Sequence, residues 1–234
     1  MARARARREL CLYNSSMALR AAATKNMALA AEPSAERPVR PAARPSRVIL
    51  IRHGRPALPI SPKAGHEGFR AYIGEYEEAG LDPASLPPAE LADLVGGLDA
   101  VFTSDKTRAH ESARVLAPAA RVIADPLFME APLAAPRLPL LRMRVPKWAV
   151  VARVLWYMGF HPGIEPWASA RARARKAAAI LIARAEADGT AVLVGHGYFN
   201  FLIGRVLRAK GFRQTGRHRA RFWNAVIYER ERGQ

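Results

Sequence analysis

The sequence is poor in cysteine and has no long apolar run. Its one cysteine among 234 residues, Cys11, excludes an internal disulfide and a zinc site built from several thiolates, and it fits a reducing compartment. No segment approaches the roughly 18 consecutive apolar residues that a membrane-spanning helix needs. We therefore expect a cytoplasmic protein with no membrane partner.

The sequence also has few acidic residues compared with basic ones. There are 20 Asp and Glu against 37 Lys and Arg, which gives a formal net charge of +17. Such an excess is typical of proteins that bind nucleic acid, because Lys and Arg contact phosphates. Here, however, the basic residues are spread over many segments, and arginine outnumbers lysine 31 to 6, which favours a compositional bias. We therefore predict no specific nucleic-acid partner.

Hydrophobic residues are not scarce. They make up 50% of the chain, and its length suits one large domain. Residues 1–46 alternate Ala and Arg and then become rich in Pro, so we predict a largely disordered tail there. We predict a single folded domain over 47–234, with an insertion at about 131–165 that is rich in Pro, Arg and Trp.

Short apolar runs alternate with helical patterns after residue 46. Runs with β-branched residues are typical of strands buried on both faces, as in a parallel sheet. Expected strands cover 48–51, 99–103, 121–124, 191–194 and 220–229, and expected helices cover 68–80, 88–95, 106–116, 148–157, 167–188 and 198–210. This order predicts an α/β fold, a three-layer αβα sandwich around a mainly parallel sheet, with a helical lid insertion.

Polar side chains follow four of the expected strands. The first strand leads to Arg52 and His53, the second to Arg108, the third to Glu130 and the fourth to His196. In an open parallel sheet, ligands bind outside the carboxyl ends of the strands. We therefore expect these side chains to meet at one edge of the sheet.

This set of side chains suits a phosphoryl group. The guanidiniums of Arg52 and Arg108 can each hold phosphoryl oxygens with paired hydrogen bonds, and helix N-termini add partial positive charge. One neutral imidazole can attack phosphorus while the other donates a hydrogen bond to its oxygens. Glu130 is the best placed carboxyl to protonate the leaving oxygen.

Three segments that each follow an expected strand carry recognisable motifs, namely 50–54 (LIRHG), 102–113 (FTSDKTRAHESA) and 194–197 (VGHG). In this order they resemble the signature segments of the histidine phosphatase superfamily, the group that includes cofactor-dependent phosphoglycerate mutases and many small-molecule phosphatases. Together they frame residues 47–229, nearly all of the foldable chain.

The resemblance implies a two-step transfer, in which His53 becomes phosphorylated and water then hydrolyses the phosphohistidine. Arg52, Arg108 and His196 would complete the phosphate pocket, with no metal and no cofactor. To attack, His53 must be unprotonated, and nearby guanidiniums should push its pKa below the reference of about 6.5.

The resemblance also suggests residues around this pocket. Glu130 lies where the family often keeps its general acid, but Ala131-Pro132-Leu133 replaces the stretch that often follows, so Glu165 and Glu67 stay open as alternatives. Arg55, directly after the triplet, is a candidate contact to substrate beyond the phosphate.

Aromatic residues near the insertion could shield the site. An apolar lid would help Glu130 to act as an acid near neutral pH. The candidate lid side chains are Phe128, Trp148, Trp156 and Trp167.

The leading hypothesis is therefore a metal-independent, histidine acid-type phosphatase that hydrolyses a small phosphorylated metabolite. A phosphoglycerate mutase-type transfer is the second hypothesis, although the loop at 55–59 (RPALP) lacks the small polar residues that mutases use there. The third is a non-catalytic, basic binding protein on the same scaffold. Neither the substrate nor the oligomeric state follows from the sequence.

Overall fold

The computed structural model describes residues 45–59 and 63–231. The elements follow the order β1 (Ser46–Arg52), α2 (His66–Glu78), α3 (Ala89–Val95), β2 (Ala100–Thr103), α4 (Thr107–Leu116), β3 (Arg121–Ala124), η1 (Pro126–Phe128), α5 (Val145–Tyr157), α6 (Trp167–Asp188), β4 (Thr190–Gly195), α7 (Gly197–Ala209), β5 (Arg213–Thr215) and β6 (Ala225–Arg230). The tail predicted over 1–46 lies outside the described residues, except for its last two positions.

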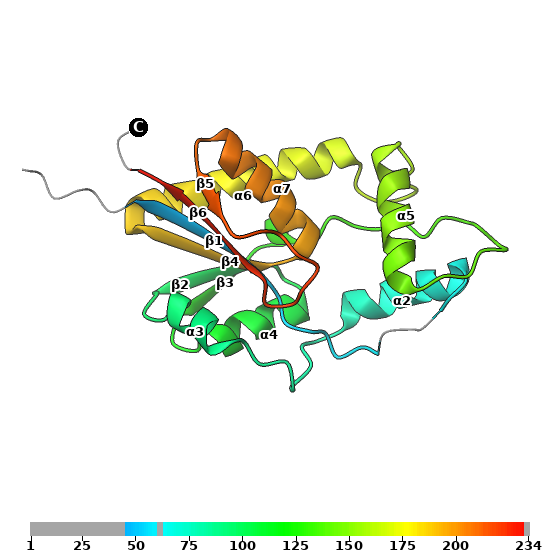
Figure 1. Ribbon diagram of the computed structural model, residues 1–234, viewed down its shortest axis with the longest axis horizontal. Helices are drawn as coiled ribbons and strands as arrows, with labels where there is room; N and C mark the ends of the chain where they lie inside the picture. Colours follow the sequence, from blue (N-terminus) through cyan, green and yellow to red (C-terminus); the bar gives the residue numbers. More distant parts are fainter. Residues whose placement is uncertain (1–44, 60–62, 232–234) are drawn as a thin grey trace, which may run out of the picture. The chain divides into compact units, whose positions relative to one another are not determined.

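The described strands form a six-stranded sheet in the order β3-β2-β4-β1-β6-β5 (Figure 1). Strands β1 to β4 pair in parallel, whereas β6 runs antiparallel to both of its neighbours. In the register of β1 with β4, Arg52 lies opposite Gly195, and the His53 amide donates to the Gly195 carbonyl at 2.9 Å. The residues that follow these two strands, His53 and His196, therefore emerge side by side.

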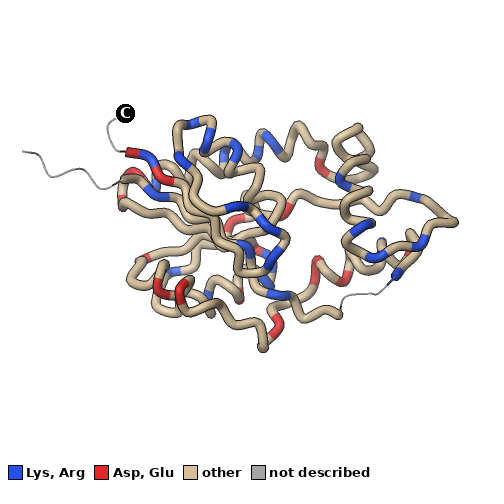
Figure 2. Tube along the Cα trace, in the orientation of Figure 1, with Lys and Arg blue, Asp and Glu red and all other residues tan. Residues whose placement is uncertain are grey.

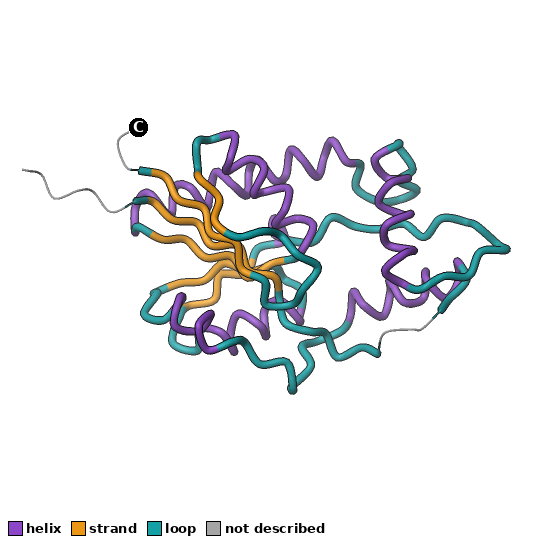
Figure 3. Tube along the Cα trace, viewed as in Figure 1, coloured by secondary structure: helices purple, strands orange, loops and turns teal. Residues whose placement is uncertain are grey.

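Helices cover both faces of the sheet and make the predicted three layers (Figure 3). Leu50 and Leu193 point into a core shared with α6 and α7. Ile51 and Val194, one position further along the same strands, point into a core shared with α3 and α4. Both cores are apolar because successive strand residues face opposite sides, and here both sides are buried.

Two further helices, α2 and α5, lie beyond the carboxyl edge of the central strands (Figure 1). They pack on one another through Phe69 and Trp148, whose rings stack with centroids 5.5 Å apart. A bridge between Ala64 and Met143 also joins the chain before α2 to the chain before α5. The helix of the 131–165 region is thereby held against α2.

The α/β class, the mainly parallel sheet and all of the expected strands are confirmed, with shifts at their ends. The edge strand β5 was not predicted, because three residues without an apolar pattern give no signal. The last strand was expected from residue 220 but begins at Ala225, because Trp223 has a left-handed φ of 58° that interrupts extended chain. None of the described helices is long and apolar enough to cross a bilayer.

Candidate active site

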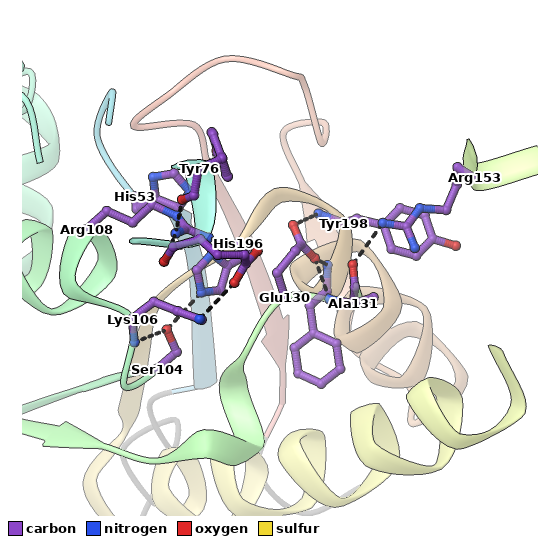
Figure 4. Close-up of polar contacts among 12 residues, drawn as sticks. His53, Tyr76, Ser104, Lys106, Arg108, Glu130, Ala131, Arg153, His196 and Tyr198 are labelled. Carbon is purple, nitrogen blue, oxygen red and sulfur yellow. Dashed lines mark hydrogen bonds and ion pairs between the residues drawn. The ribbon is translucent and has the colours of Figure 1, made fainter. Parts of the chain in front are cut away.

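The carboxyl edge of the sheet brings together four of the predicted site residues, Arg52, His53, Arg108 and His196, and Figure 4 labels the last three. His53 follows β1, His196 follows β4, and Arg108 lies in the first turn of α4, which follows β2. The two imidazole rings are 5.2 Å apart between centroids. His53, His196 and Arg108 are at most 1% exposed. Buried charged and polar groups of this kind need partners, which makes their hydrogen bonds informative.

A glycine holds the chain in place directly after His53. A Cβ on Gly54 would lie 2.5 Å from the Leu81 side chain and 2.6 Å from the Trp223 ring, so no other residue fits without a shift. The Gly54 amide donates to the Ser112 hydroxyl at 2.9 Å. The turn after β1 is therefore fixed between the sheet and α4.

The hydrogen bond of His53 sets its tautomer. Its Nδ1 lies 2.7 Å from the Gly54 carbonyl oxygen, which can only accept, so Nδ1 carries the proton. In the neutral ring, Nε2 then has a free lone pair. Burial, followed by the charges of Arg52 and Arg108, lowers the pKa of His53 to about 3, as predicted in direction. The ring is thus neutral at physiological pH, with Nε2 available as a nucleophile.

His196 is held by a serine that the motif also contains. Its Nε2 lies 2.8 Å from the Ser104 hydroxyl, while its Nδ1 is buried without a hydrogen-bond partner among the described residues. Burial, and then the charges around it, lowers the pKa of His196 well below its ordinary value of 6.5. If Ser104 donates to Nε2, the proton of the neutral ring lies on Nδ1 and is free to donate to a ligand.

Each of the two site arginines stacks on an aromatic ring. The Arg52 guanidinium lies 4.5 Å from the Phe222 ring centroid, and that of Arg108 lies 4.5 Å from the Tyr76 centroid. Arg108 also donates through Nη1 to the Tyr76 carbonyl at 2.6 Å. Such stacking fixes the plane of a guanidinium, which a bidentate contact to a phosphoryl group requires.

Several buried donors of this site have no partner within the described part of the chain. They are Arg52 Nε, Arg108 Nε, Arg108 Nη2 and His196 Nδ1. Arg108 Nη2 has only a distant carboxylate, an oxygen of Glu77 at 3.8 Å. Unsatisfied buried donors are costly, and a group of them around one point is the arrangement that an oxyanion would satisfy. The chemistry of this cluster suits an anionic ligand.

Glu130 lies on the chain after η1, against the N-terminus of α7 (Figure 4). One of its carboxylate oxygens accepts from the Phe199 amide at 2.7 Å and the Ala131 amide at 2.9 Å, and the other accepts from the Tyr198 amide at 3.1 Å. These amides include orphan donors of a helix N-terminus, where a carboxylate is stabilised. Because α7 begins directly after His196, Glu130 borders the anion site without contacting either histidine.

The two alternative carboxylates are placed differently. Glu165 forms an ion pair with Arg173 at 2.7 Å, and Arg173 also donates to the Met129 carbonyl at 2.7 Å. Glu165 thus braces the chain that carries Glu130. Glu67 is exposed in the first turn of α2. Glu130 is the carboxylate that the structure brings to the N-terminus of α7, next to His196.

Arg55 lies two residues beyond His53 on the surface. It forms an ion pair with Asp82 at 2.8 Å, and its side chain is 53% exposed. It also lines a cleft of about 350 Å³ with Leu86, Arg221 and Phe222. The Phe222 ring borders both this cleft and the His53 ring, which lies 5.8 Å away. Arg55 is therefore near the candidate site but outside the cluster of buried donors.

Two aromatic residues at the site were not predicted. The Tyr76 hydroxyl lies 3.5 Å from His53 Nε2, the nitrogen with the free lone pair. Phe222 supports Arg52 from the connection between β5 and β6. No local signal marks either residue, because each reaches the site only through tertiary packing.

The four candidate lid side chains are packed in or against apolar cores. Phe128 and Trp156 are 1% exposed and belong to the large core beside α6, and Trp148 is buried in the cluster between α2 and α5. Only Trp167 is partly buried against the core. An amphipathic helix buries its largest side chains, so the tryptophans of α5 pack into these cores, and their role as a lid stays a prediction.

The described residues contain no group of three or more His, Cys, Asp or Glu side chains that could hold a metal ion. The fold and the site together define an α/β protein with a cluster of two arginines and two neutral histidines at the carboxyl edge of its sheet.

Comparison with models of protein families identifies the family of this chain. The profile of the histidine phosphatase superfamily (branch 1) matches residues 48–231. The chain belongs to this superfamily, as predicted from the three motifs, and its members are phosphatases and mutases. Compared with curated proteins, the sequence has no significant match.

Solved structures resemble the chain in fold. The structure of open reading frame Rv3214 from Mycobacterium tuberculosis has a TM-score of 0.52 at 19% identity, covering 80% of this chain and 92% of that one. A mycobacterial glucosyl-3-phosphoglycerate phosphatase has a TM-score of 0.45 at 21% identity, covering 70% and 80%. Phosphoserine phosphatase from Entamoeba histolytica has a TM-score of 0.49 at 18% identity, covering 77% and 89%. The first of these likenesses supports the shared fold.

Proposed function

We propose that the protein hydrolyses phosphomonoesters of small metabolites through a phosphohistidine on His53. One observation carries the proposal: buried donors of Arg52, Arg108 and His196 have no partner among the described residues, and they belong to the same cluster as His53, whose Nε2 carries the lone pair of the neutral ring. A phosphoryl group placed there would satisfy the donors and present phosphorus to Nε2.

In the first step, the Nε2 lone pair attacks phosphorus and the bond from phosphorus to the ester oxygen breaks. The departing oxygen takes a proton, for which Glu130 is the proposed donor. The arginines and His196 Nδ1 stabilise the charge on the equatorial oxygens. In the second step, water attacks the phosphohistidine, gives its proton to the same carboxylate, and releases phosphate with neutral His53.

The proposal includes no metal ion, because two guanidiniums and an imidazole already meet the phosphoryl charge. Turnover in the presence of EDTA should therefore equal turnover without it. This agrees with the acid-type, metal-independent chemistry that the family resemblance implies.

The direct experiment is hydrolysis of p-nitrophenyl phosphate by three proteins. The wild type should turn it over, and His53→Ala should lose turnover by about 10³-fold or more, as expected for loss of a covalent nucleophile. His161→Ala is the matched control, because His161 is an exposed histidine outside the site. A His53→Ala protein as active as the control would refute the proposal, and an inactive wild type would favour the non-catalytic binding protein.

A mutase is the second candidate, since the superfamily contains both activities. It would pass the phosphoryl group from His53 to a second hydroxyl of the substrate instead of to water. Residues 55–59 (RPALP), directly after Gly54, have no small polar side chain to hold such an acceptor. Product analysis with a monophosphoglycerate and a bisphosphate primer separates free phosphate from an isomerised ester.

A further inference from the structure

The segment 137–160 carries most of the exposed apolar side chains. Of the eleven large hydrophobic side chains exposed in the described part of the chain, eight belong to it: Leu138, Leu140, Leu141, Val150, Val154, Tyr157, Met158 and Phe160. Leu140, in the connection before α5, is 99% exposed. Single exposed apolar residues are ordinary, but such a concentration marks an interaction surface.

The helix α5 is apolar on two opposite faces. Its buried face carries Val145, Trp148, Ala152 and Trp156. Val150, Val154 and Met158, spaced by four residues, form a second stripe that is 63%, 50% and 70% exposed. A helix that is apolar all round is normally covered on all sides. The outer stripe of α5 has no cover within the described residues.

The charge of this segment is of one sign. Residues 131–164 contain no Asp or Glu, while exposed basic residues lie at Arg137, Arg142, Arg144 and Lys147. Figure 2 shows the basic positions along the connection that leads into α5, without acidic positions among them. The three leucines at 138, 140 and 141 thus lie between Arg137 and Arg142. The surface combines apolar side chains with positive charge and suits an anionic, apolar partner.

We propose that residues 137–158 bind the surface of an anionic lipid bilayer. The leucines would enter the boundary between headgroups and acyl chains, and the four basic side chains would contact lipid phosphates. Long basic side chains can hold their charge at headgroup level beside a buried apolar residue. The sequence led us to expect no membrane partner, but that expectation rested on spanning helices, which surface binding does not need.

Two other partners fit less well. A second copy of the chain would bring Arg142, Arg144 and Lys147 against the same residues across a two-fold interface, with no carboxylate in the segment to offset them. An acidic protein would need a shaped recess, whereas the most exposed leucine lies in an irregular connection. A cleft of about 350 Å³ lies elsewhere, at Arg55 and Arg221.

The test is sedimentation of the full-length protein with vesicles of phosphatidylcholine alone and of phosphatidylcholine mixed with phosphatidylglycerol. Binding should require phosphatidylglycerol and weaken with added salt. The double variant Leu140→Ser, Leu141→Ser should bind the mixed vesicles about tenfold less well or worse, because two inserted side chains lose their apolar contact. Its hydrolysis of p-nitrophenyl phosphate should stay unchanged.

The matched control is Leu86→Ser, Val115→Ser, which replaces two apolar residues exposed elsewhere. This variant should bind as the wild type does. The proposal is overturned if neither vesicle binds the wild type, or if the leucine variant binds as tightly as the control, since attraction by net charge alone would then explain binding. It is also overturned if sedimentation velocity shows a dimer that the leucine variant dissociates.

Discussion

The ring of His196 lies edge-on to the ring of His53, with 5.2 Å between their centroids and both rings buried. Two imidazoles this close do not both take up a second proton and become charged, and the charges of Arg52 and Arg108 oppose the charging of even one ring. Both rings are therefore neutral, as the nucleophile His53 must be, and a neutral His196 still has one N–H to donate. Burial at the carboxyl edge of β1 and β4 is what keeps both rings neutral.

Stability should depend on pH through His53. Its pKa is about 3 in the folded protein and 6.5 without the fold, so only the unfolded chain takes up this proton between those values. The contribution of neutral His53 to the free energy of unfolding is therefore fully present above pH 6.5, and it is lost progressively as the pH falls toward about 3. Urea unfolding of the wild type and of His53→Gln, from pH 7 to pH 4, measures it. The stability difference between the two proteins should shrink or reverse on acidification, and a constant difference would contradict the assignment.

Tyr76→Phe should slow formation of the phosphohistidine. The hydroxyl lies 3.5 Å from His53 Nε2, where a phosphoryl oxygen would lie during attack, and the ring supports Arg108. Phenylalanine keeps the ring and removes only the hydroxyl, so we expect kcat to fall about tenfold with the fold intact, as for loss of one hydrogen bond in the transition state. Tyr72→Phe, one turn earlier on α2, is the control. Equal kinetics for the wild type and Tyr76→Phe would assign Tyr76 a packing role alone.

Glu130→Gln separates a proton donor from a helix cap. If Glu130 protonates the leaving oxygen, the variant should lose about 10²-fold or more in kcat with an alkyl phosphate, whose leaving group needs the proton. It should lose little with p-nitrophenyl phosphate, whose leaving group departs without one. If Glu130 only stabilises the start of α7 through Tyr198 and Phe199, both substrates should slow alike and the protein should unfold at a lower temperature.

The sequence predicted those site residues that topology alone brings together. His53 follows β1, His196 follows β4, and Arg108 lies in the first turn of the helix after β2. Parallel strands put such positions at one edge of the sheet. Tyr76 could not be predicted in this way, because α2 is placed by tertiary contacts such as the stacking of Phe69 on Trp148 and the hydrogen bond from Arg108 to the Tyr76 carbonyl. The register of two helices on each other depends on side-chain fit and leaves no periodic signal.

Phe222 and the aromatic lid show the same limit. Phe222 reaches Arg52 because Trp223 adopts a left-handed backbone, which its residue type does not favour. For the tryptophans of α5, the sequence shows which residues share a helix face. It does not show which neighbouring element that face contacts. The contacts of Glu130 with α7 depend likewise on where η1 directs the chain after β3.

Trapping the covalent intermediate tests the central claim most directly. The wild type, mixed with a phosphomonoester labelled in its phosphoryl group and quenched in base within the first turnover, should carry one phosphoryl group that acid removes, as a phosphohistidine does. Peptide mapping should locate it on His53, and His53→Ala should carry none while His161→Ala carries as much as the wild type. Steady hydrolysis by a wild-type protein that never acquires label at His53 would contradict the account.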